Sequence, residues 1–142
     1  MRVLGLDVGE KTIGVAVSDP LGITAQGLQV IRRSALDKDL EQLAKLVESY
    51  QVEQIVVGMP RRTDGSYGPE AEKVEQFAKA LQQAVPVPIT FWDERFSTVT
   101  AERILLEGDV SRAKRRKVVD KVAASVILQA YLDQQRGGLT NE

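Results

Sequence analysis

Three acidic side chains stand where apolar segments of the chain end or begin. Asp7 closes the apolar run that starts at Val3, Glu94 follows the run Ile89–Trp92, and Asp120 stands near the start of the last apolar stretch. An unpaired carboxylate is costly to bury in such surroundings. Carboxylates that converge on one point also need a cation if they are to stay ionised together.

The absence of histidine and cysteine among the 142 residues limits what this chemistry can be. It removes the commonest general base, thiolate metal sites and disulfides. Catalysis would have to depend on carboxylates, lysines, hydroxyls or a metal held by oxygen atoms. Oxygen ligands select a hard cation, so the expected cofactor is Mg²⁺ or Mn²⁺.

Length and composition predict one globular domain, because 142 residues that are 43% hydrophobic can bury a single substantial core. The net charge of −1 means that any attraction to nucleic acid must come from a local patch. No apolar run is long enough to span a bilayer and the start does not resemble a signal peptide, so we expect a cytoplasmic protein with no membrane partner.

The elements that must position the acids follow from hydrophobic periodicity. Three β-branched runs near the start predict antiparallel strands, and the rest of the chain alternates strand and helix. The expected fold class is therefore α/β, with a mixed five-stranded sheet flanked by helices, in one domain over residues 1–136 and a frayed tail over 137–142. The expected strands are Val3–Asp7, Ile13–Asp19, Gly27–Arg33, Gln54–Val57 and Ile89–Trp92, and the expected helices are Leu36–Tyr50, Pro69–Gln83, Val99–Glu107 and Lys117–Gln135.

Helical spacing places Asp120 on one face with Ala124, Ile127 and Tyr131, so a carboxylate occupies the stripe that should pack on the sheet. Asp7 and Glu94 fall at strand ends, where sites in such sheets gather. Each acid also has a purely structural explanation. Asp7 could stabilise the hairpin turn, Asp120 could favour a helix start, and Glu94 with its neighbour Asp93 could be a solvated strand end.

A cluster of basic residues surrounds Asp120 in a chain that is otherwise slightly acidic. Such a cluster can meet the phosphates of a nucleic acid, although a solvated helix start is the alternative. Arginines near the other acids would extend the patch, and Tyr67 could stack on a base. The basic residues are Arg112, Lys114, Arg115, Arg116, Lys117 and Lys121, with Arg61, Arg62 and Arg95 as the extension.

Four segments resemble the family of YqgF-type Holliday junction resolvases, which is also described as nucleases that mature the 5′ end of 16S ribosomal RNA precursor. They are "GLDVGEKTIGVAVSD", "VVGMPRRTDGSYGPEA", "DERFSTVTAERIL" and "KVVDKVAASVILQAYLD", in family order over nearly the whole chain. The resemblance implies a ribonuclease H-like fold with an acidic metal site at Asp7, Glu94 and Asp120. Asp93 remains a possible substitute or supporting partner.

We therefore expect a divalent-metal-dependent nuclease that acts on structured nucleic acid, either precursor rRNA or branched DNA. Two ions roughly 4 Å apart can activate a water and stabilise the departing oxyanion, while Lys11 or Thr12 could touch the scissile phosphate. The chain would be a monomer or a weak homodimer. A non-enzymatic RNA-binding assembly factor is the alternative, and an actin-like ATPase is a further one, because its first phosphate-binding hairpin also has the pattern Asp-x-Gly.

Overall fold

The computed structural model describes residues 1–60, 67–93 and 112–140, and over 112–121 and 137–140 the description is limited to the helical backbone. Five strands form one sheet in the order β3-β2-β1-β4-β5. The strands are β1 (Val3–Val8), β2 (Thr12–Ser18), β3 (Ala25–Arg32), β4 (Gln54–Met59) and β5 (Ile89–Asp93), and the helices are α1 (Leu36–Ser49), α2 (Pro69–Ala84) and α4 (Arg112–Thr140).

The sheet is mixed, as the sequence predicts. β2 pairs antiparallel with both β1 and β3, whereas β1, β4 and β5 pair in parallel. The carboxyl ends of β1, β4 and β5 therefore lie at one edge of the sheet. In sheets of this kind, ligands bind beyond that edge.

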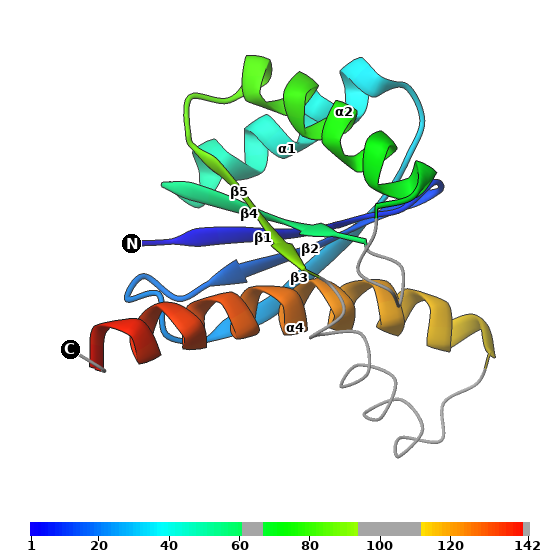
Figure 1. The fold of residues 1–142 in the computed structure, drawn as a ribbon. Helices are drawn as coiled ribbons and strands as arrows, with labels where there is room; N and C mark the ends of the chain where they lie inside the picture. The colour runs from blue at the N-terminus through cyan, green and yellow to red at the C-terminus, as the bar shows by residue number, and fades with distance from the viewer. Residues whose placement is uncertain (61–66, 94–111, 141–142) are drawn as a thin grey trace.

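Helices cover both faces of the sheet, with α1 and α2 on one face and α4 on the other (Figure 1). The faces have separate cores because side chains alternate along each strand. Leu4 and Leu6 of β1 join the core under α1 and α2, whereas Val3 joins the core under α4. The stripe expected on the last helix is confirmed from Ala124 onward. Ala124, Ile127, Leu128, Tyr131 and Leu132 are all buried against the sheet.

Gly5 allows α4 to lie very close to β1. A Cβ atom at this position would lie 2.8 Å from the Cβ of Leu128 and 3.3 Å from the carbonyl oxygen of Ala124. Further along α4, the Tyr131 hydroxyl accepts a hydrogen bond of 2.8 Å from the side chain of Gln54, which pairs with Val3. The helix thus runs antiparallel to β1, and its N-terminal part lies toward the carboxyl edge (Figure 1).

The ends of the last helix differ from the sequence-based expectation. Its backbone is helical from Arg112 to Thr140, beyond the expected Lys117–Gln135 at both ends. The run before Lys117 contains Ala, Lys and Arg, which favour helix, and the glycines after Gln135 weaken a helix without forbidding one. The expected helix Val99–Glu107 lies outside the described residues. Among the helices of the described residues, none is long and apolar enough to cross a membrane.

The close approach at Gly5 predicts the effect of one added methyl group. Gly5→Ala should destabilise the fold by roughly 1–3 kcal/mol, because the new Cβ meets the Cβ of Leu128 and the helix backbone rather than a flexible side-chain end. Urea unfolding followed by circular dichroism measures the change. An unchanged midpoint would mean that α4 can move away from β1 at little cost.

Candidate active site at the carboxyl edge of the sheet

Asp7 is half-buried in β1, one residue before the strand ends. It pairs with Gly14 of β2, so no side chain stands opposite it on the neighbouring strand. Leu6 and Val8 pack toward α1 and α2. By alternation Asp7 therefore shares the face of Gly5, which packs on α4. The sequence-based position of Asp7 at a strand end is confirmed.

The turn between β1 and β2 is closed by a hydrogen bond of 2.8 Å from the Gly9 amide to the Thr12 carbonyl. Lys11 is exposed at its tip, and Thr12 is half-buried at the start of β2. Because Ile13 is buried on the α1 and α2 side, Thr12 shares the face of Asp7. One short hairpin thus presents an acid, a hydroxyl and an ammonium group near the same edge.

The other two predicted acids are described only in part. Asp120 lies within α4, one helical turn before the buried Ala124, and the structure describes its backbone. Glu94 lies outside the described residues, directly after the end of β5. Among the side chains that the structure describes, no three acidic groups lie together as a metal site.

Asp93 lies on the face of the sheet opposite Asp7. It pairs with Met59 of β4 and lines a cavity of about 590 Å³ with Ala71 and Glu72 of α2. Trp92, one residue earlier, packs toward α4 and meets the Tyr131 ring edge-to-face at 6.2 Å. This placement disfavours the idea that Asp93 substitutes for Glu94 as a partner of Asp7.

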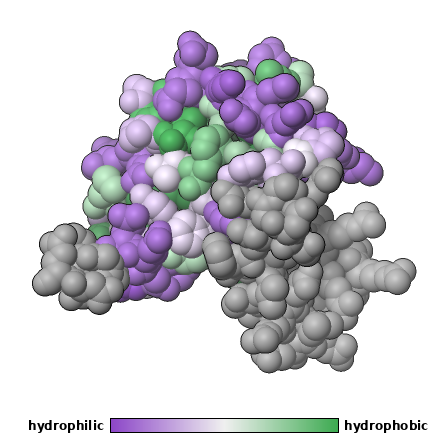
Figure 2. Space-filling view, in the orientation of Figure 1, coloured by the Kyte–Doolittle hydropathy of each residue, from purple (hydrophilic) through white to green (hydrophobic). Residues whose placement is uncertain are grey.

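Hydrophobic side chains gather over β5, between the hydrophilic outer surface of α2 and α4 (Figure 2). Phe91 of β5 is 42% exposed there, and Tyr67 lines the same cavity. The ring of Tyr67 is exposed, as a base-stacking residue must be, but the nearby carboxylates of Glu72 and Glu75 would repel a phosphate.

The predicted basic residues fall into two groups. The cluster around Asp120 lies in the N-terminal part of α4, toward the carboxyl edge of the sheet, where the structure describes the backbone. Arg61, Arg62 and Arg95 lie outside the described residues. The residues on α4 are Arg112, Lys114, Arg115, Arg116, Lys117 and Lys121.

Two arginines that were not among the predicted basic residues, Arg32 and Arg33, border the site. Arg32 is exposed, pairs with Thr12, and follows the buried Ile31, so it lies on the Asp7 face. Arg33 turns to the other face. The alternation of apolar and polar residues in the third strand could have indicated Arg32, whereas the partners of Arg33 come from distant parts of the chain.

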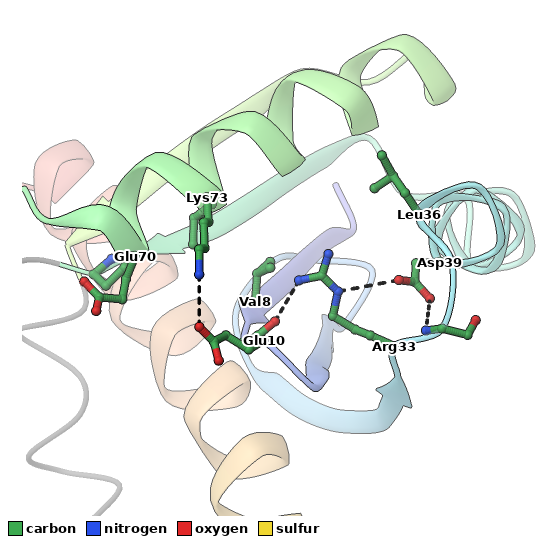
Figure 3. Close-up of a pocket in the computed structure, with 11 residues that line it drawn as sticks. Val8, Glu10, Arg33, Leu36, Asp39, Glu70 and Lys73 are labelled. Carbon is green, nitrogen blue, oxygen red and sulfur yellow. Dashed lines mark hydrogen bonds and ion pairs between the residues drawn. The ribbon is translucent and has the colours of Figure 1, made fainter.

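Behind the hairpin, a cavity of about 660 Å³ lies between the turn and the first turns of α1 and α2 (Figure 3). Lys73 of α2 reaches the carboxylate of Glu10 there, at 3.1 Å. The hydrogen bond from Lys73 and its positive charge lower the pKa of Glu10 below its ordinary value. This exposed ion pair ties the tip of the hairpin to α2.

Known structures with the same arrangement of strands and helices identify the fold. RuvC of T. thermophilus in complex with a Holliday junction substrate matches with a TM-score of 0.63 and 19% identity, and the match covers 96% of each chain. A fowlpox virus resolvase in complex with Holliday junction DNA matches with a TM-score of 0.56 and 12% identity, over 95% of this chain and 99% of that one. The fold is therefore the ribonuclease H-like fold of the junction resolvases.

The family follows from the sequence. Residues 1–134 match the RuvX family, described as Holliday junction resolvase, and the chain belongs to that family. Two relatives carry the name "Putative pre-16S rRNA nuclease". The protein of Moorella thermoacetica is 60% identical over 94% of this chain and 96% of its own length. That of Desulforamulus reducens is 57% identical over 94% of this chain and 97% of its own length. The expected resemblance and fold class are confirmed.

The ion pair between Lys73 and Glu10 should make the stability of the fold depend on pH. Because the pKa of Glu10 is lowered in the folded state, the pair stabilises the fold above the ordinary pKa of Glu10, and this contribution is lost as the pH falls through the lowered value. Lys73→Gln should raise the pKa of Glu10 toward its ordinary value and remove this part of the pH dependence.

Carboxyl NMR titration of Glu10 measures the shift. Lys79→Gln is the matched control, because Lys79 forms a similar exposed pair with Glu75 on the same helix. A Glu10 titration that is the same in Lys73→Gln and wild type would show that the pair does not form in solution.

Proposed function

We propose that the chain is a divalent-metal-dependent nuclease whose catalytic acids are Asp7, Glu94 and Asp120. Membership of the RuvX family supports hydrolysis of phosphodiester bonds. The names of the relatives favour 5′-end processing of 16S rRNA precursor as the reaction, with resolution of branched DNA as the second candidate substrate. We place the reaction in the cytoplasm.

The observation that carries the proposal is the antiparallel passage of α4 under β1. Gly5 lies against Ala124 and Leu128. Asp7 stands two residues further along the strand, a rise of about 6.6 Å. Asp120 stands one turn earlier on the helix than Ala124, a rise of about 6 Å in the same direction. The helical turn that contains Asp120 is therefore level with Asp7.

We propose Glu94 as the third acid because it directly follows Asp93, the last residue of β5, whose carboxyl end lies at the same edge of the sheet as that of β1. Three carboxylates from β1, the end of β5 and α4 would then surround one point beyond the carboxyl edge.

The donor set fits a hard cation. Asp7 supplies a half-buried carboxylate at a strand end, and a chain without histidine or cysteine offers oxygen ligands. Mg²⁺ or Mn²⁺ held there supplies Lewis acidity for the attacking water and the departing oxygen. Lys11 at the exposed tip of the turn and the Thr12 hydroxyl bind and orient the scissile phosphate.

The substrate is held through its backbone. The basic first turns of α4 and the exposed Arg32 lie toward the same edge as Asp7. Cations in these places contact phosphates on either side of the scissile one, which gives affinity without sequence preference. We propose that Arg61, Arg62 and Arg95 extend this surface.

Metal binding by Asp7 can be tested without an activity assay. With Mn²⁺ at about a hundred times its dissociation constant, the wild type should gain roughly 2.7 kcal/mol of stability, because the unfolded chain has no assembled site. Asp7→Asn should be as stable as the wild type or more stable in EDTA, since one of several like charges is removed, and it should lose most of the gain in Mn²⁺.

Thermal melts in EDTA and in Mn²⁺ decide the matter, with Asp37→Asn as control because Asp37 is exposed in the first turn of α1. If Asp7 only stabilises the turn, Asp7→Asn should lose about 1 kcal/mol in both conditions. That result, with a wild type that does not respond to Mn²⁺, would exclude a metal site at Asp7.

Cleavage assays on precursor rRNA and on junction DNA, with Mg²⁺ or Mn²⁺, test the reaction itself. Asp7→Asn, Glu94→Gln and Asp120→Asn should each abolish cleavage and leave nucleic-acid affinity largely intact. Activity retained in one variant would remove that residue from the catalytic set. Metal-independent binding without any cleavage would indicate a non-enzymatic RNA-binding factor.

The basic turns of α4 have their own test. Replacement of Arg115, Arg116 and Lys117 by Gln should weaken binding to all sequences alike and reduce the salt slope by up to roughly 0.9 for each phosphate that is no longer neutralised. Arg2→Gln is the control, because Arg2 lies at the amino end of β1, over the Tyr50 ring. An unchanged slope would mean that these residues face bulk solvent.

A further inference from the structure

Arg33, which lines the cavity behind the hairpin, contacts three parts of the fold: the β1–β2 turn, α1 and α2 (Figure 3). Its guanidinium Nη1 donates to the Gly9 carbonyl at 2.8 Å, and its backbone amide donates to the Lys11 carbonyl at 2.8 Å. Its Nε lies 3.5 Å from a carboxylate oxygen of Asp39 in α1, and its Cζ lies 5.1 Å from the centre of the Phe77 ring in α2.

Asp39 is a buried carboxylate in the first turn of α1. The residue is 1% exposed, one oxygen accepts the Ser34 amide at 3.2 Å, and the other faces Arg33. A charge this deeply buried is stabilised only in a fixed, paired arrangement. The Arg33 side chain is therefore held in place by its contacts with α1 and α2.

Through these contacts Arg33 connects α1 and α2 to the β1–β2 turn, which follows Asp7. The turn residues are Gly9, Glu10 and Lys11, and Arg33 binds the first and the third through their carbonyl oxygens. Lys11 is exposed at the tip of this turn, and Thr12 starts β2 on the face of the sheet that carries Asp7. A rotation of the turn would move these groups while the sheet stayed intact.

We propose that Arg33 is a positioning residue, held by Asp39, that fixes the β1–β2 turn so that Lys11 and Thr12 meet the scissile phosphate beside Asp7. The inference rests on the proposed nuclease function. Arginine suits this position because its planar guanidinium points one nitrogen at Gly9 and another at Asp39 while its flat face lies over Phe77. The ammonium of a lysine would have to serve both acceptors from a single atom and has no flat face to stack.

Arg33→Lys tests the proposal because it preserves the charge next to Asp39. We expect a folded protein whose kcat for cleavage falls about a hundredfold, as a small displacement of a catalytic group can cause, with KM changed little. The Gly9 amide, which donates to Thr12 within the turn, should exchange with solvent about tenfold faster, because the turn opens locally.

Arg2→Lys is the matched control. Arg2 also lies over an aromatic ring, at 5.8 Å from the centre of Tyr50, but at the other end of β1. It should leave kcat, KM and the exchange of Gly9 unchanged. In Arg33→Ala, added ethylguanidinium should restore part of kcat through the open cavity, and ethylammonium at the same concentration should not.

If Arg33→Lys does not fold, Asp39→Asn replaces it, because the amide oxygen can still accept the Ser34 amide while the charge that holds Arg33 is removed. The same fall in kcat and the same faster exchange are expected. An unchanged kcat in a folded variant, with an active wild type, overturns the positioning role. If the wild type shows no metal-dependent cleavage, the proposed nuclease function is wrong. In that case the Gly9 exchange rate still tests the positioning role, which is wrong if the rate is the same in the variants and the wild type.

Discussion

The packing of α4 directly on β1 is the constraint on which the rest of the structure depends. Gly5 lets the helix approach the strand so closely that an added methyl group would collide with the Cβ of Leu128. The contact fixes the distance between α4 and β1 and also the position of α4 along its own axis. It therefore decides which turn of α4 lies level with Asp7. A site assembled from the first strand and the last helix requires such a contact, since more than a hundred residues separate them.

The hairpin that follows Asp7 separates two kinds of environment. Its α4 face carries Asp7 and Thr12, whereas its other face meets Arg33, which stacks on Phe77 and pairs with the buried carboxylate of Asp39. Polar groups fixed by packing lose little entropy when a substrate binds, which is the usual requirement for a preorganised site. The buried Asp39 is costly for a fold of this size, and its two partners lie in the segment that leads from the sheet into α1.

Much of the fold could be predicted from the sequence, because it is encoded in local patterns. Runs of β-branched residues in β1 and β2, and the helical spacing of Leu40, Leu43 and Val47, identify strands and a helix without any knowledge of tertiary structure. The position of Asp7 at a strand end followed from the same patterns. The ends of α4 did not. Helix-favouring residues continue before Lys117, and the glycines after Gln135 weaken a helix without ending it, so the local pattern gives no boundary at either end.

The sequence by itself determined the kinds of atoms available for chemistry: oxygen ligands, lysines and arginines, with no imidazole and no thiol. It also determined the order of strands and helices. Only the tertiary structure decided which faces these groups share. It placed Asp93 on the α2 side, away from Asp7, and it joined Arg33 to Gly9 and Asp39 across three elements. The physical reason is that strand register and helix docking depend on side-chain packing between segments far apart in the chain, which no local spacing records.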